Sequence, residues 1–153
     1  MAQKTLRPSD LAAIAAVVDP DLNTAGTHTS GWVDMSTFQC IMAVVMAGTL
    51  GAAATLDAKL EQAKDAAGLD AKDLDGGAIT QMTKAGGDDD KQAVIQCYGE
   101  DLDLEKGYTH VRLSMTVAAA SSDSAGLIFG MSPRYPPASN HDAESVAEIV
   151  TLN

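Results

Sequence analysis

The chain has 153 residues and a mass of 15.8 kDa, which is the size of one domain. Its 21 acidic and 10 Lys or Arg residues give a formal net charge of −11 at pH 7. This balance argues against nucleic-acid binding and against docking on an anionic membrane. Apolar residues make up 46 %, but 26 of them are alanine and only six residues are aromatic, so the expected core is modest.

The first thirty residues are typical of an arm attached to a domain. Ser9 and Asp10 precede an alanine-rich run that Pro20 ends, which predicts a short helix over 11–18. Residues 19–30 contain Pro, Asn, Gly, Thr and Ser, which indicates a polar linker. The sequence therefore predicts an N-terminal arm and linker at 1–30 and one domain with a C-terminal tail at 31–153.

The run from Phe38 to Leu56 contains no charged residue and nearly has the length of a membrane span. Glycines interrupt it and alanine is frequent in it, so it predicts buried strands joined by a turn. The next segment, Thr55 to Ala63, is ambiguous. Leu56, Ala58 and Leu60 alternate with polar residues as in a strand, whereas its Ala, Lys, Leu, Glu and Gln content favours a helix.

Later segments alternate clearly between apolar and polar residues. Residues 92–98, 109–117 and 125–131 each have apolar side chains at every second position, and polar turns such as 121–124 separate them. Short strands with polar turns at this spacing predict a mainly β fold. We expect a jelly-roll-like antiparallel β-sandwich with an N-terminal arm or short helix.

Two cysteines, Cys40 and Cys97, lie among apolar neighbours and form no CxxC pair. No apolar segment near the N-terminus resembles a secretion signal, so we expect a protein made in the cytoplasm. Free, buried thiols are therefore predicted rather than a disulfide.

No chemical motif stands out in the sequence. His28, His110 and His141 lie far from one another and lack zinc-ligand spacing. The run Asp88 to Asp90 suggests a calcium loop, but it lacks the D-x-[DN]-x-[DN]-G pattern, so an exposed turn is preferred. No nucleophile elbow or phosphate-binding loop occurs. We expect no catalytic, cofactor or metal site, and no enzyme.

The most distinctive local segment is 132–138, where three prolines favour an extended path around Arg134 and Tyr135. Arg, Tyr and Trp are enriched at interface hot spots, so Arg134, Tyr135 and Trp32 are the candidate interface residues. The alternative is structural: a loop that ends a strand, with Tyr135 capping the core and Trp32 anchoring it.

Several segments, taken together in their order and spacing, resemble the capsid decoration (cement) proteins of tailed double-stranded-DNA bacteriophages. The similar segments are Gly31 to Met35 with Phe38, the apolar run Ile41 to Leu50, Ala54 to Leu60, Ala78 to Gln81, Tyr108 to Leu113, and Pro133 to Tyr135. No single segment is specific to the family.

The resemblance implies a β-sandwich subunit that binds the major capsid protein on the outer surface of the capsid and bridges capsomers, as a homotrimer and without chemistry. It also implies that Thr55 to Ala63 is a strand with Leu56, Ala58 and Leu60 inward. Two alternatives stay open. One is a tail-tube or head–tail joining protein, and the other is a β-sandwich that binds carbohydrate or another ligand.

Overall fold

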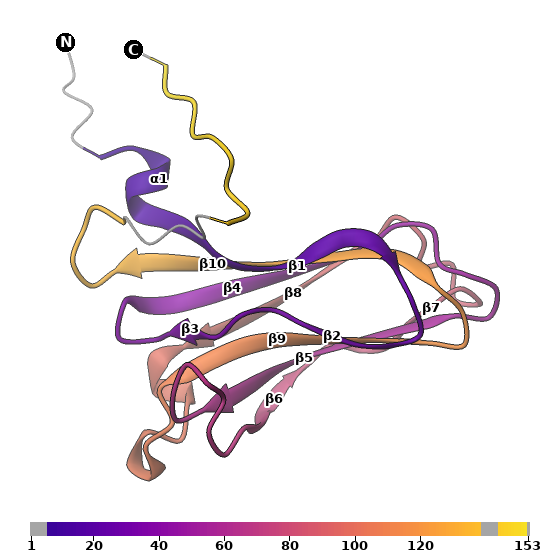
Figure 1. The fold of residues 1–153 in the computed structure, drawn as a ribbon, viewed down its shortest axis with the longest axis horizontal. Helices are drawn as coiled ribbons and strands as arrows, with labels where there is room; N and C mark the ends of the chain where they lie inside the picture. The colour runs from indigo at the N-terminus through magenta and orange to yellow at the C-terminus, as the bar shows by residue number, and fades with distance from the viewer. Residues whose placement is uncertain (1–5, 139–143, 153) are drawn as a thin grey trace.

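The computed structural model describes residues 6–138 and 144–152 (Figure 1). Nearly all of its regular structure is β. The elements in chain order are α1 (Pro8–Leu11), β1 (Ala12–Asn23), β2 (Gly26–Thr29), β3 (Val33–Asp34), β4 (Phe38–Ala47), β5 (Thr55–Ala63), β6 (Lys72–Ala78), β7 (Met82–Thr83), β8 (Gln92–Tyr98), η1 (Gly99–Asp101), η2 (Leu104–Lys106), β9 (His110–Ala118) and β10 (Ser122–Pro133).

Two antiparallel sheets form the two layers seen in Figure 1. Sheet A has the order β1-β10-β4-β8, and sheet B has the order β2-β9-β5-β6, with β3 beside β9 and β7 beside β5. When the eight strands on these two paths are numbered along the chain, the orders become 1-8-3-6 and 2-7-4-5. This is the double-sheet arrangement of a jelly roll. The predicted antiparallel β-sandwich is confirmed.

The core lies between the sheets and takes alternate residues of each strand. Its largest fully buried side chains are Phe38, Ile41, Leu50, Leu56, Leu60, Leu113, Met115 and Ile128. The ambiguous segment is strand β5, and Leu56, Ala58 and Leu60 face the core as expected. The uncharged run predicted as buried strands forms β4 and the start of β5. Within the described residues, no helix is long and apolar enough to cross a membrane.

The helix predicted over 11–18 is wrong for nearly all of its length. Only Pro8–Leu11 is helical, and Ala12–Asn23 is β1, whose pairing with β10 runs from Ala12 opposite Met131 to Asn23 opposite Ser122. The hydrogen bonds to β10, together with burial of Ala13, Ala16 and Val18, override the helical preference of alanine.

The predicted boundary at residue 30 is also corrected. β1 is an edge strand of sheet A, and β2 (Gly26–Thr29) pairs with β9 in sheet B. Residues 12–29 therefore contribute two strands to the sandwich instead of forming an arm and a linker. Thr27 shows the attachment directly, because its Oγ1 lies 3.0 Å from Thr116 Oγ1 on β9.

Between Ala125 and Met131, Ile128 is the one large side chain of strand β10 that faces the core. Leu127 and Phe129 are half-buried on the outer side, whereas Gly126 and Gly130 face inward. A Cβ on Gly126 would lie 2.5 Å from Leu113 Cδ2, so a core side chain of sheet B already fills that space. The alternation at 125–131 thus predicts the strand correctly, but the side that carries Leu127 and Phe129 faces outward instead of toward the core.

Candidate interaction surfaces

The outer side of sheet A is uncharged over the middle of all four strands. We call the residues of its four cross-strand rows the sheet A face. The rows are Ala12–Met131–Cys40–Tyr98, Ile14–Phe129–Met42–Gln96, Val17–Leu127–Val44–Val94 and Ala125–Met46–Gln92. Met46, Val94 and Tyr98 are 40 %, 51 % and 57 % exposed, and the only amide side chains are Gln92 and Gln96. A contiguous apolar surface of this kind is typical of a binding surface.

Sheet B presents the opposite character on its outer side. Its outward side chains on β5 and β9 include Asp57, Lys59, Glu61 and Arg112. Arg112 Nε donates to Glu61 Oε2 at 2.6 Å, and Lys59 Nζ lies 2.7 Å from Asp73 Oδ1 on β6. The hydrogen bond to Asp73 raises the pKa of Lys59 above its ordinary value, which already lies far above neutral pH. The two faces of one sandwich therefore differ sharply in charge.

Acidic side chains border the sheet A face at one end. Asp21, Asp90 and Asp123 line a hollow of about 480 Å³ together with Met46 and Gln92 of the face. An apolar centre with a charged border is the usual anatomy of a protein interface. The border also adds repulsion against any acidic surface that approaches from that end.

The candidate interface residues Arg134 and Tyr135 follow β10 at the other end of the sheet A face. Arg134 N–H donates to Thr37 O at 2.9 Å, and its Nε lies 3.3 Å from Met35 O. Tyr135 is 90 % exposed, so it does not cap the core. The loop is fixed to the body at Arg134 and leaves the ring of Tyr135 in solvent.

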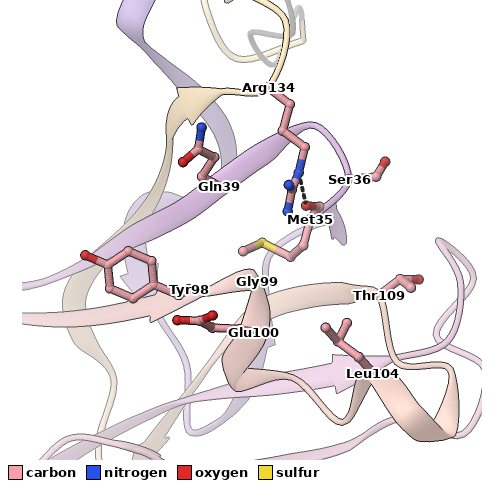
Figure 2. A pocket seen from close by; sticks show the side chains of 9 residues that line it. All are labelled: Met35, Ser36, Gln39, Tyr98, Gly99, Glu100, Leu104, Thr109 and Arg134. Carbon is pink, nitrogen blue, oxygen red and sulfur yellow. Dashed lines mark hydrogen bonds between the residues drawn. The ribbon is translucent and has the colours of Figure 1, made fainter.

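Arg134 also lines a hollow of about 530 Å³. Figure 2 shows Arg134 entering it from the end of β10, with Glu100 and Leu104 on the opposite side. Tyr98 belongs both to this hollow and to the sheet A face, so the two surfaces are continuous at that corner. The lining of the hollow includes an arginine, a carboxylate and a tyrosine. Such a lining is better suited to binding a polar protein surface than to forming a buried active site.

Trp32 lies elsewhere, on the side of sheet B. The guanidinium carbon of Arg112 lies 4.5 Å from the centre of the indole, a cation–π contact. Gly68, at φ +84°, passes close to the indole, because a Cβ there would lie 2.9 Å from Trp32 Nε1. The structure therefore brings Arg134 and Tyr135 together and holds Trp32 against β9 and the loop after β5.

Both cysteines are free, as predicted. They lie on neighbouring strands but on opposite faces of sheet A, since Cys40 pairs with Tyr98 and Cys97 pairs with Ile41. This geometry points the two thiols away from each other. Burial raises the pKa of the Cys97 thiol to about 12, whereas Cys40 is half-buried on the sheet A face.

The polar candidates from the sequence are engaged within the chain. His28 Nε2 lies 2.9 Å from Thr24 O, His110 Nδ1 lies 2.9 Å from Thr109 Oγ1, and His141 lies outside the described residues. Asp88 Oδ2 accepts the Thr83 N–H at 2.8 Å, and Asp89 pairs with Lys84. In the described ranges, no three His, Cys, Asp or Glu side chains are placed to hold a metal ion.

Sequence reasoning missed the sheet A face, although the sequence contains a signal for it. The run Ile41 to Met46 is apolar at every position, and in an antiparallel two-layer sandwich only alternate positions reach the core. A strand that is apolar on both sides therefore indicates an outer face that another surface covers.

Neither a protein-family model nor a curated protein sequence matches the chain. Among solved structures, a chain of the Cowpea Mosaic Virus empty virus-like particle is similar, with a TM-score of 0.43, 10 % identity and coverage of 86 % of this chain and 85 % of that one. The CBM22-1 xylan-binding domain of Paenibacillus barcinonensis Xyn10C has a TM-score of 0.38 and 10 % identity, over 86 % of each chain. These similarities do not select between functions.

Proposed function

We propose that this protein is a structural component of a virus particle, a capsid decoration subunit that binds the outer surface of the shell of a tailed bacteriophage. The observation that carries the proposal is the sheet A face, an uncharged apolar surface on a chain of net charge −11. Such a face is costly to leave in water and gains free energy when another protein subunit covers it. The resemblance in sequence order to decoration proteins supports the phage assignment.

The charge distribution fits a position outside a DNA-filled shell. The sheet B face, with Glu61, Lys59 and Arg112, stays solvated, and the acidic excess repels nucleic acid. In this proposal the sheet B side faces solvent and the protein performs no chemistry. Its task is to bridge capsomers of the major capsid protein through many repeated contacts.

The contact with the shell is proposed at the end of the sandwich that carries Arg134 and Tyr135. Arg134 is held by Thr37 and Met35, so its position is fixed before binding. Tyr135, exposed in the free chain, is the kind of rigid aromatic side chain that buries well at an interface. Trp32 lies on the sheet B side, away from this contact, and its assignment as an interface residue stays a prediction.

Binding to shells tests this proposal. Purified protein is added to shells that lack it, and bound copies are counted after sedimentation. We expect saturable binding with many copies per shell, and a loss of affinity of about tenfold or more for Tyr135→Ala, the size of effect seen at interface hot spots. Leu69→Ala is the matched control, because Leu69 is an exposed apolar residue in the loop after β5.

Two results would contradict the proposal. Absence of wild-type binding to shells, together with retention on a glycan array, would favour a carbohydrate-binding module. Binding of a ring of copies at a single vertex would identify a tail-tube or head–tail joining protein instead.

A further inference from the structure

We infer that the sheet A face binds a second copy of this chain, with the end of the C-terminal segment of one copy, residues 149–152, lying on the sheet A face of its neighbour. The inference rests on the proposed function only in treating the sheet A face as an assembly surface. It names the partner of that face and the segment that covers it.

Charge favours a second copy at this face. Copies with a net charge of −11 repel one another, and the repulsion is weakest where no charged side chain lies. The four rows of the sheet A face contain none, whereas the sheet B face carries Asp57, Glu61, Lys59 and Arg112. The acidic border at Asp21 and Asp123 leaves the centre of the face as the part that suits an uncharged, apolar occupant.

The end of the C-terminal segment, Ile149 to Leu152, is such an occupant, because it carries no charged side chain. The segment leaves the sandwich on the side of sheet A. Figure 1 shows residues 144–152 running away from the sandwich above sheet A. Ser145 to Glu148 and the face residues Val17, Met46 and Leu127 line an open hollow of about 650 Å³. Beyond this hollow the apolar side chains are uncovered: Ile149, Val150 and Leu152 are 50 %, 73 % and 83 % exposed.

The dimensions of the segment and the face agree. The face spans four strands and six residue steps along β4, which is about 19 Å by about 20 Å. Four extended residues, 149–152, reach about 13 Å and so fit within the length of the face. The face alone offers about 400 Å² in projection, which is half of the about 800 Å² that each partner buries in a stable interface.

An exchange of C-terminal segments between copies supplies the rest of the buried area that a stable interface needs. Each copy gives one segment and receives one, so every copy takes part in two contacts. A contact of this kind joins two different surfaces, and it closes either in a pair or in a ring. The homotrimer implied by the resemblance is one such ring.

The test is the oligomeric state of the full-length chain, measured by sedimentation equilibrium without shells. Met46→Glu places a carboxylate on the face, and the double variant Val150→Glu, Leu152→Glu places two on the segment. We expect either change to weaken self-association by about a hundredfold or more, because a charge would be buried without a partner. Leu69→Glu is the control, since Leu69 is 54 % exposed away from the face and should leave self-association unchanged.

Mixing the variants distinguishes segment exchange from simple stacking of faces. The face variant keeps an intact segment, and the segment variant keeps an intact face, so the mixture should form one-to-one heterodimers. Val94→Glu serves as a second face variant, and thermal unfolding confirms that each chain is folded.

Three results would overturn the inference. These are a wild-type chain that stays monomeric, a segment variant that self-associates as well as wild type, and a mixture without heterodimers. A monomeric chain that still binds shells would leave the proposed function intact, whereas a self-associating chain that ignores shells would overturn only that function.

Discussion

The ring of Phe38 lies directly against the backbone of Gly130. A Cβ at position 130 would stand 2.3 Å from Phe38 Cε2, closer than any real side chain approaches. Phe38 is only 2 % exposed and sits at the start of β4, opposite Pro133 of β10. The largest fully buried side chain of the core therefore occupies the space that a side chain on β10 would need. Glycine at 130 is a requirement of core packing.

Gly130→Ala should destabilise the fold by about 1–3 kcal/mol, because the added methyl group overpacks the core. Chemical denaturation measures this loss as a change in the free energy of unfolding. Gly31→Ala is the matched control, since a Cβ there meets nothing within 4 Å and the expected change is small. Adding Phe38→Leu to Gly130→Ala should cost less than the sum of the single changes, and simple additivity would contradict the packing account.

The thiols should differ in reactivity. Cys97 is buried with its pKa raised to about 12, so it is expected to stay unreactive toward a thiol reagent until the protein unfolds. Cys40 is half-buried on the sheet A face and should react in the folded monomer. Mass spectrometry of the labelled chain, with Cys40→Ser as control, checks the assignment. Protection of Cys40 at high protein concentration would be a second sign that copies cover this face.

Asp89 should make stability depend on pH in acid. The side-chain hydrogen bond from Lys84, and then the Leu50 N–H, lower the pKa of Asp89 in the folded state. The unfolded value is about 3.9, so the stabilisation is complete above that pH and is lost as the pH falls through the lower folded value. Asp89→Asn should therefore reduce the difference in unfolding free energy between neutral and acidic solution. An unchanged pH dependence, equal to that of the exposed Asp75→Asn control in β6, would contradict this role.

Trp32, the only tryptophan, should report on its contact with Gly68. Gly68→Ala introduces a Cβ at φ +84° and beside the indole, so we expect a stability loss of about 1 kcal/mol and a shift in Trp32 fluorescence. Gly76→Ala is a closely matched control, since Gly76 also has a positive φ, +74°, but nothing within 4 Å. It should lose stability without a fluorescence shift. Equal spectra for both variants would contradict the contact.

The strands that alternate strictly were predictable from the sequence. His110–Ala118 places Val111, Leu113 and Met115 in the core, as the period of two requires. The strand at residues 12–23 could not be predicted from the sequence, because its alanines favour a helix locally and only the pairing with β10 makes it a strand. Hydrogen bonds to a partner more than a hundred residues away, such as Asn23 Nδ2 to Ser124 O at 3.0 Å, leave no local pattern.

The candidate surfaces were predictable only in part. Arg134 and Tyr135 stand out by residue type and neighbouring prolines, and the structure places them at one end of the sheet A face. The face itself depends on which side of β10 reaches the core. Gly126 and Gly130 look like breaks in an apolar strand, yet they face inward and send Leu127 and Phe129 outward. The side of β10 that faces the core is determined by side chains of other strands, Leu113 and Phe38. A short stretch of sequence around β10 does not contain them.

We propose that this chain coats a shell in many copies. The most direct test of this proposal is the number of copies in purified particles, obtained by quantitative protein staining against the shell subunit. We expect a copy number of the same order as that of the shell subunit. A count limited to a single ring per particle, or absence from the particle, would contradict it.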